Sequence, residues 1–233
     1  LHKIPLNNIL FLDIETVPQA ASFDLLDSET QELYAAKTQY QRKEISAQEF
    51  YERAGIWAEF GQIICISVGY FTSSSAGEFR VRSFSGPEVD LLREFNSLLD
   101  EHFNRPYHRL CAHNGKEFDF PYLARRMTIL GIPLPNNLQL FGKKPWEVPH
   151  LDTMELWKFG DFKHYTSLRL LAKVLGIPSP KEDISGDQVR EVYYEDNDID
   201  RIIEYCQRDT ITVAQIFLRY RNQDILTDDH IKY

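Results

Sequence analysis

The stretch "ILFLDIETVP", residues 9–18, sets an apolar run directly before two acidic residues. Its first four residues are continuously apolar, which predicts a strand buried on both faces of a sheet. On such a strand Asp13 and Glu15 point to the same face, roughly 6.6 Å apart along the chain. Two carboxylates beside a core repel each other and lose solvation, and a bound cation would offset both costs. The alternative is that the strand has already ended and both side chains are in water.

The chain has the composition of a globular protein. Its 233 residues, 43% hydrophobic and 26% charged, suffice for a substantial core. No run approaches the ~18 apolar residues of a membrane span. The net charge of −9 argues against a broad basic surface for duplex nucleic acid, but it permits nucleic acid held in a metal-filled cleft. Cys65, Cys111 and Cys206 form no CxxC pair, and the chain starts without an apolar signal segment, so we expect buried thiols in a cytoplasmic protein.

Strand and helix patterns alternate along the chain, which predicts one α/β domain over residues 1–233 with a mixed sheet. Besides the first stretch, strands are predicted at 62–71, 78–84 and 109–113. Helical patterns are found at about 120–130, 187–195 and 199–220, and a Pro/Asn-rich loop at 132–149.

Residues 19–60 differ from their surroundings in composition. They are rich in Gln, Glu, Ala and Lys and lack glycine until Gly55, which predicts a helical insert between the first two strands. Both ends of this insert adjoin the acidic stretch, so we expect it to cover the cleft, with aromatic side chains contacting an entering strand. The alternative is a helical packing layer without substrate contact.

Two further motifs carry acidic residues. "AHNGKEFDFPYL", residues 112–123, places Asp119 at a helix start, where an acid taken alone would act as a cap. "YCQRD", residues 205–209, places Tyr205 and Asp209 four residues apart on one helix face, where taken alone they would be a surface pair.

Taken in order, DIE, NxxxFD and YxxxD resemble the three exonuclease motifs of the DEDD superfamily. Tyr205 indicates the DEDDy branch, because the DEDDh branch has His where this chain has Glu204. "FLDIETVP" and "NGKEFDFPYL" are most similar to the proofreading 3′–5′ exonuclease domain of family-B DNA polymerases. "HLDTMELWKFGD" and "TSLRLLAKVLGIPSPKEDISG" extend the resemblance to predicted stand-alone exonucleases related to that domain. The resemblance covers most of residues 9–220, and least of the insert.

The resemblance implies a ribonuclease H-like fold, with a mixed five-stranded sheet, the first strand central and helices on both faces. It also implies catalysis by two divalent ions, Mg²⁺ or Mn²⁺, which prefer carboxylate oxygens as ligands. Asp13 would bridge both ions, and Glu15 and Asp209 would hold the ion that carries the attacking water. Asp119 would hold the second ion, and Tyr205 would orient the water.

Several residues are candidates for substrate contact. Thr16 and Asn114 match positions that contact the terminal nucleotide in the family, and Phe118 of the second motif is a third candidate. A strand-end hydroxyl and a turn asparagine are the alternatives for the first two. "LWKFGDFKHY", residues 156–165, interleaves aromatic residues with Lys158, Lys163 and His164 and could bind a single strand, or it could be an amphipathic helix end. We expect His113 and His150 to be structural.

The sequence therefore predicts a cytoplasmic, metal-dependent 3′–5′ exonuclease that acts on the 3′ end of single-stranded DNA. We expect no polymerase within these residues, since the nuclease motifs span them. One alternative is an RNA 3′-exonuclease. Another is a catalytically silent nucleic-acid-binding module of the same fold, which the presence of all four acids and the tyrosine argues against.

Overall fold

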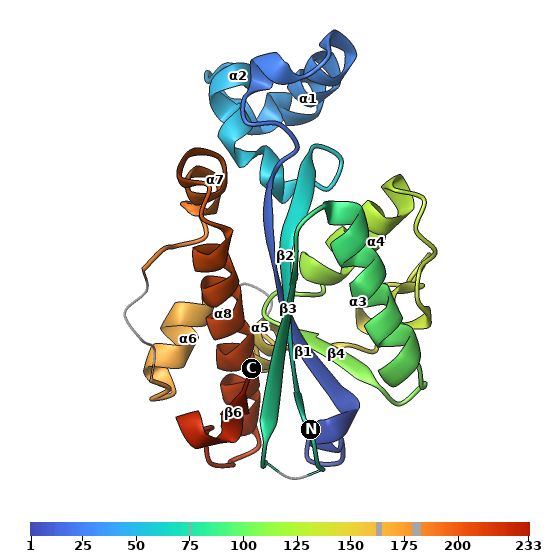
Figure 1. The fold of residues 1–233 in the computed structure, drawn as a ribbon, viewed down its shortest axis with the longest axis vertical. Coiled ribbons are helices and arrows are strands. Elements are labelled where there is room, and N and C mark those ends of the chain that lie inside the picture. The colour runs from blue at the N-terminus through green and yellow to red at the C-terminus, as the bar shows by residue number, and fades with distance from the viewer. Residues whose placement is uncertain (75, 162–164, 179–182) are drawn as a thin grey trace.

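The computed structural model describes residues 1–74, 76–161, 165–178 and 183–233 (Figure 1). Its sheet has six strands in the order β5-β4-β1-β2-β3-β6. Their bounds are β1 Ile9–Pro18, β2 Gly61–Phe71, β3 Phe79–Ser85, β4 Arg109–Ala112, β5 Leu151–Asp152 and β6 Ile231–Lys232.

The sheet is mixed, as predicted. β1 lies inside it, antiparallel to β2 and parallel to β4. β3 is antiparallel to β2, and β5 is parallel to β4. The predicted number of five strands is wrong by one, because the two residues of β6 pair in parallel with the edge of β3. A two-residue strand leaves no periodic signal in the sequence, and only the tertiary fold brings it to that edge.

Helices cover both faces of the sheet (Figure 1). α3 and α4 pack on one face, and α8 packs on the other. The helices are α1 Ser28–Arg42, α2 Ala47–Phe50, α3 Glu88–His102, α4 Asp119–Ile129, α5 Thr153–Trp157, α6 Leu168–Val174, α7 Val189–Glu191 and α8 Ile199–Tyr220. Among the described residues, none of these helices is both long and apolar enough to cross a membrane.

The alternation of side chains along β1 determines where its acids point. Leu10 and Leu12 are fully buried in the core under α3 and α4, whereas Phe11 is buried in the core under α8. The ring of Phe11 lies 5.6 Å from that of Phe217 in α8, centroid to centroid. Because successive side chains of a strand point to opposite faces, the residues that continue the phase of Phe11 face α8. These are the two acids of the opening stretch.

The insert at 19–60 contains α1 and α2 and has a small aromatic core of its own. Tyr34, Phe50, Tyr51 and Phe60 form this core, which lies beyond the ends of β1 and β2 (Figure 1). The end of the insert is fastened to α4, where the Tyr122 hydroxyl donates to the Gly55 carbonyl at 2.8 Å and Arg126 Nη1 donates to the Ala58 carbonyl at 2.8 Å. Its beginning is fastened near α7, where Arg190 Nη2 donates to the Ala21 carbonyl at 2.6 Å.

Candidate active site

Asp13 and Glu15 lie within β1 and not after it. The strand continues to Pro18, so the alternative that it ends before these acids is wrong. Glu15 pairs with Cys65 of β2, and the register then shifts so that Thr16 pairs with Ile63. Glu15 is only 8% exposed. The register shift leaves Ile64 of β2 without a partner in β1, so the irregularity lies in the neighbouring strand beside the acids.

Helix α8 contributes Tyr205 and Asp209. Two hydrogen bonds hold the helix against the sheet at the residues that directly follow them in sequence. The Cys206 thiol donates to the Asp13 carbonyl at 3.4 Å, and the Thr210 hydroxyl donates to the Ser67 carbonyl at 3.2 Å. The Tyr205 hydroxyl hydrogen-bonds to the Asp209 carboxylate. Burial raises the pKa of Tyr205, and the charges of Asp209, Glu15 and Asp13 raise it further. The phenol therefore stays protonated and can donate a hydrogen bond.

Asp119 is the first residue of α4 and is 3% exposed. Its carboxylate accepts hydrogen bonds from its own backbone N–H and from that of Ile14 in β1. It is therefore not the solvent-exposed cap that its position alone would allow. The contact with Ile14 brings the second motif against the first.

The four carboxylates repel one another. Burial raises the pKa of Asp13 well above its ordinary value, and the charges of Glu15, Asp209 and Asp119 add to this shift. Burial likewise raises the pKa of Glu15, with Asp209 as the next cause, while a hydrogen bond from Asp13 opposes the rise. When no cation is present, the protonated forms of Asp13 and Glu15 are therefore favoured more than they are in water. The fold thus brings the acids of the three motifs into one buried site, where the ionised form of each carboxyl group is destabilised.

This donor set fits a divalent cation. Single ligand atoms of Asp13, Glu15 and Cys206 lie within 4.8 Å of one another. Carboxylate oxygens suit hard ions such as Mg²⁺ and Mn²⁺, and a cation would relieve the repulsion between the acids. Cys206 is a buried thiol, as predicted. Burial raises its pKa and it donates to the Asp13 carbonyl, so the carboxylates are the ligands here that suit a hard ion.

Asn114 closes the turn after β4 and is held by Asp152 of β5. It adopts a left-handed conformation with φ of 62°. The Asp152 carboxylate accepts four backbone N–H groups, from Asn114, Lys116, Met154 and Glu155, at 2.9–3.1 Å. Asp152 caps α5 as its spacing indicates, and it also fixes the turn of the second motif, which the sequence did not reveal.

The other substrate candidates line the α4 side of β1. Thr16 hydrogen-bonds with Tyr122, and the ring of Phe118 lies 5.2 Å from that of Tyr122. Phe118 precedes Asp119 at the start of α4. The structure thus places both candidates near the second motif, and their contact with substrate stays a prediction.

Two histidines have structural roles, as predicted. His113 hydrogen-bonds through both ring nitrogens, to the Thr153 hydroxyl at 2.9 Å and to the Thr166 carbonyl at 2.8 Å. His150 accepts from the Leu110 N–H at 3.2 Å and donates to the Asn137 carbonyl at 2.8 Å.

Of the basic residues predicted in the 156–165 stretch, Lys163 and His164 lie outside the described residues. Lys158 follows α5 and lines a groove beside α4.

Comparison with known proteins decides the family. Residues 56–231 match the family of predicted 3′–5′ exonucleases related to the exonuclease domain of PolB. The chain belongs to this family. The matched residues include the second and third motifs but begin after the first motif. The structure, and not the family match, brings Asp13 and Glu15 together with those motifs.

The fold of the chain is also similar to a solved structure. The family B DNA polymerase from the hyperthermophilic archaeon Pyrobaculum calidifontis matches with a TM-score of 0.57 and 18% sequence identity. The match covers 91% of this chain and 24% of the polymerase chain, so the chain spans about a quarter of that protein. At this identity the likeness concerns the fold, and it supports the ribonuclease H-like architecture that the motifs predicted.

Proposed function

We propose that this chain is a metal-dependent 3′–5′ exonuclease of the DEDDy type that removes nucleotides from single-stranded DNA. The observation that supports it best is the convergence of Asp13, Glu15, Asp119 and Asp209, which come from three separate segments and repel one another. Carboxyl groups whose pKa values are strongly raised by burial and by neighbouring acids are concentrated at functional sites of proteins. The hydrogen bond between Tyr205 and Asp209 adds a proton donor beside the acids.

The four acids would hold two divalent ions, Mg²⁺ or Mn²⁺. When bound, such ions activate a water molecule and stabilise the leaving oxygen of a phosphodiester. Tyr205 would orient that water through its neutral hydroxyl, because the acids around it keep its pKa high. A neutral phenol is a poor ligand for a hard cation, so its role would lie in positioning.

The reaction would be hydrolysis of the last phosphodiester. The water oxygen forms a bond to phosphorus, and the bond from phosphorus to the 3′ oxygen of the preceding nucleotide breaks. That 3′ oxygen takes up a proton and becomes the new 3′ hydroxyl, and the released nucleotide keeps a 5′ phosphate. Thr16, Asn114 and Phe118 would hold the terminal nucleotide while this occurs.

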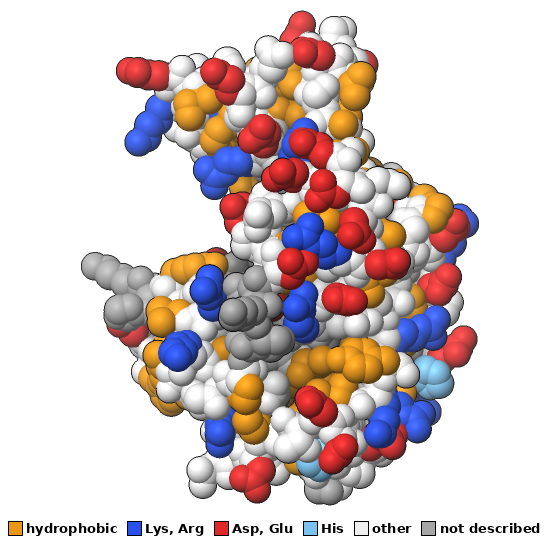
Figure 2. All heavy atoms as spheres, turned by 60° about the vertical axis from the view of Figure 1, so that its left-hand side comes forward, with side chains coloured by type: hydrophobic (Ala, Val, Ile, Leu, Met, Phe, Trp, Pro, Cys, Tyr) orange, Lys and Arg blue, Asp and Glu red, His pale blue; other side chains and the backbone are white. Residues whose placement is uncertain are grey.

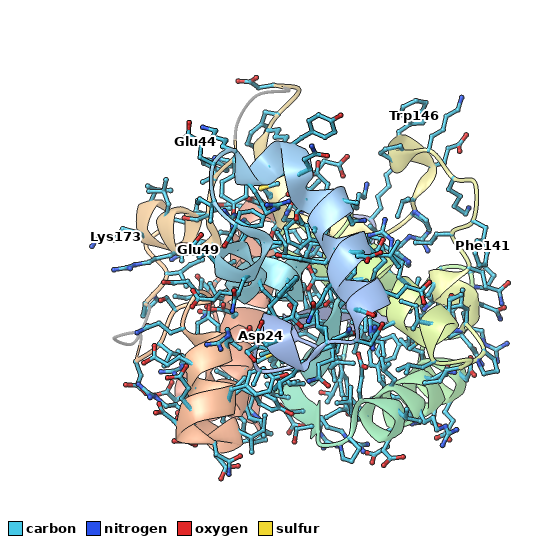
Figure 3. All side chains as sticks on the ribbon, turned by 90° about the horizontal axis from the view of Figure 1, so that it is seen from above. Asp24, Glu44, Glu49, Phe141, Trp146 and Lys173 are labelled. Atoms are coloured by element: carbon cyan, nitrogen blue, oxygen red, sulfur yellow. The ribbon has the colours of Figure 1, made fainter. Side chains whose placement is uncertain are left out.

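We further propose that residues 1–233 form a single nuclease domain in which the insert at 19–60 covers the entering strand. The insert carries eight acidic and four basic residues, a net charge of −4. Acidic side chains are visible over it at the top of the molecule (Figure 2), and Asp24, Glu44 and Glu49 among them are labelled in Figure 3. Such a surface repels phosphates. Because Tyr34, Phe50 and Tyr51 are buried in the core of the insert, contact with a strand would depend on exposed side chains such as Tyr40, which is 93% exposed. The predicted cytoplasmic location stays a prediction.

Four labelled oligomers test this proposal and its alternatives. DNA and RNA strands of the same sequence, each labelled at the 5′ or the 3′ end, are incubated with Mn²⁺ or with EDTA. We expect 5′-labelled DNA to shorten one nucleotide at a time and 3′-labelled DNA to release its label at once, in Mn²⁺ only. Faster loss of RNA would favour the RNA exonuclease. Binding without any shortening would indicate the silent module.

A further inference from the structure

A groove of about 700 Å³ runs between α4 and the 132–149 segment and reaches the turn of the second motif at Asn114, although none of the four acids lines it. Asn114 and Asp152, which shape the turn of the second motif, line one part of it, and Phe141 and Lys143 line another. Most of its wall is apolar and includes the buried ring of Phe120. The volume falls within the ~300–1,000 Å³ that is usual for ligand sites.

The 132–149 segment carries two exposed aromatic residues. Phe141 is 80% exposed and Trp146 is 74% exposed, and they lie on the same side of the molecule (Figure 3). The stretch "FGKKPW", residues 141–146, contains two lysines and no acid, in a chain with a net charge of −9. Lys144 Nζ lies 5.3 Å from the ring centroid of Trp146. Exposed aromatic rings interleaved with cations are typical of surfaces that bind single-stranded nucleic acid.

The groove has cations that no acid neutralises. Acidic residues do line it, and Glu155 pairs with Lys116 at 2.6 Å. Lys143 and Lys158, however, form no salt bridge with any residue that the structure describes. Burial lowers the pKa of the nearby His150 to about 4, and positive charges including that of Lys143 contribute to this shift. Although the lining contains as many acidic as basic residues, Lys143 and Lys158 are therefore available to a ligand phosphate.

Asn114 offers an unused acceptor where the groove meets the second motif. Its side-chain oxygen Oδ1 is buried and has no hydrogen-bond partner within the described part of the chain. A buried acceptor without a partner is rare in folded proteins, and a ligand that donates a hydrogen bond there would satisfy it. Asn114 also belongs to the second motif, so the groove reaches the turn that precedes Asp119.

We propose that this groove, together with the exposed ring of Trp146 next to its lining residue Pro145, binds the nucleotides on the 5′ side of the one being removed. Bases would stack on Phe141 and Trp146, and phosphates would contact Lys143 and Lys158. This inference rests on the proposed function. A stacking surface accepts every base, which suits an enzyme that degrades strands of any sequence. An apolar groove could also take a peptide, but Lys143 and Lys158, which form no salt bridge with the described residues, favour a polyanion.

Binding of short oligomers provides the test. The affinities of 5′-fluorescein-labelled oligothymidylates of two to ten nucleotides are measured by anisotropy with the whole protein, in Ca²⁺ and at several salt concentrations. We expect the wild-type protein to bind tighter as length increases. The double variant Phe141→Ala/Trp146→Ala should bind the longer oligomers about 10-fold or more weakly than the wild-type protein does, since each stacked base contributes strongly to the affinity. Lys143→Ala should lower the slope of log affinity against log salt by about 0.7.

Two substitutions elsewhere serve as matched controls. Tyr107 is an aromatic residue that is 56% exposed and does not line the groove, and Lys173 is a lysine on the opposite side of the molecule from Trp146 (Figure 3). Tyr107→Ala and Lys173→Ala should both keep the wild-type dependence on length and salt.

The proposal fails if the double variant binds long oligomers as tightly as the wild-type protein does, and the segment would then be a candidate for a protein partner. Failure of the proposed function looks different. In that case wild-type protein in Mn²⁺ degrades no oligomer, while its length-dependent binding and the loss of that binding in the double variant persist.

Discussion

Replacing Asp119 by Asn should stabilise the metal-free protein, by an amount that grows with pH. Burial raises the pKa of Asp119 from 3.8 to about 8, and the charge of Asp152 adds to the shift. Below its ordinary pKa the carboxyl is protonated in both the folded and the unfolded state and contributes nothing. As the pH rises, the unfolded chain releases this proton first, so the folded state loses stability until the carboxyl ionises near pH 8.

The size of this loss follows from the shift. One pKa unit corresponds to about 1.4 kcal/mol, and about three units separate 3.8 from pH 7. Asp119 therefore lowers the free energy of unfolding by about 4 kcal/mol at pH 7, whereas the total for a protein is roughly 5–15 kcal/mol. Asparagine does not ionise, so Asp119→Asn should gain about 4 kcal/mol relative to wild type between pH 4 and pH 7.

Urea unfolding in EDTA at these two pH values measures the difference. Added Mn²⁺ should reduce it at pH 7, because a cation stabilises the wild-type carboxylate. Parallel stability curves for the two proteins, or a variant that is less stable at pH 7, would refute the reasoning.

A neighbouring buried acid provides a matched control with the opposite sign. Asp152 is 2% exposed and accepts four backbone N–H groups, with Lys116 N bound to Oδ2 at 3.1 Å and the others to Oδ1. In Asp152→Asn an NH₂ group must replace one of the two acceptor oxygens and face a donor. We expect a loss of about 1–3 kcal/mol at pH 7, with or without metal.

Three other perturbations separate catalysis from folding. Asp13→Ala and Asp209→Ala should each abolish turnover without lowering the metal-free Tm, because removing one acid relieves repulsion; a Tm that collapses in both would make these acids structural. Tyr205→Phe should keep metal affinity and stability and lower kcat by roughly 10- to 10⁴-fold, and wild-type activity would instead make Tyr205 a packing residue. Replacing residues 28–50 of the insert by a short Gly/Ser linker should raise KM for oligonucleotides, and an unchanged KM would contradict the proposed cover.

The opening stretch predicted the position of the site because its signal is local. The continuously apolar run Ile9–Leu12 predicts a buried strand without any tertiary information, and β1 is buried over this run as predicted. Tyr205 and Asp209 could be predicted for the same reason, since helix spacing alone places them on one face. These residues can be found from the local sequence pattern without knowledge of any tertiary contact.

The features that the sequence did not reveal depend on contacts between distant segments. The Asp152 carboxylate accepts a hydrogen bond from the backbone N–H of Asn114, which is 38 residues away in the sequence, and no local pattern predicts this contact. A helix predicted over 187–195 is instead the short α7 followed by a π-helical turn, Val192–Asp196, that ends at Asn197 with φ of 53°. The Tyr194 hydroxyl in this turn donates to the Pro18 carbonyl at 2.6 Å. We attribute the change of helix geometry to this contact with the end of β1.

Anomalous diffraction from crystals grown with Mn²⁺ tests most directly whether the four acids hold catalytic ions. The account predicts two anomalous peaks about 3.5–4 Å apart, with the Asp13 carboxylate between them and Glu15, Asp209 and Asp119 around them. Both peaks should disappear from crystals of Asp13→Ala grown under the same conditions. Wild-type crystals in which Mn²⁺ occupies other sites and leaves these four carboxylates without an ion would contradict the account.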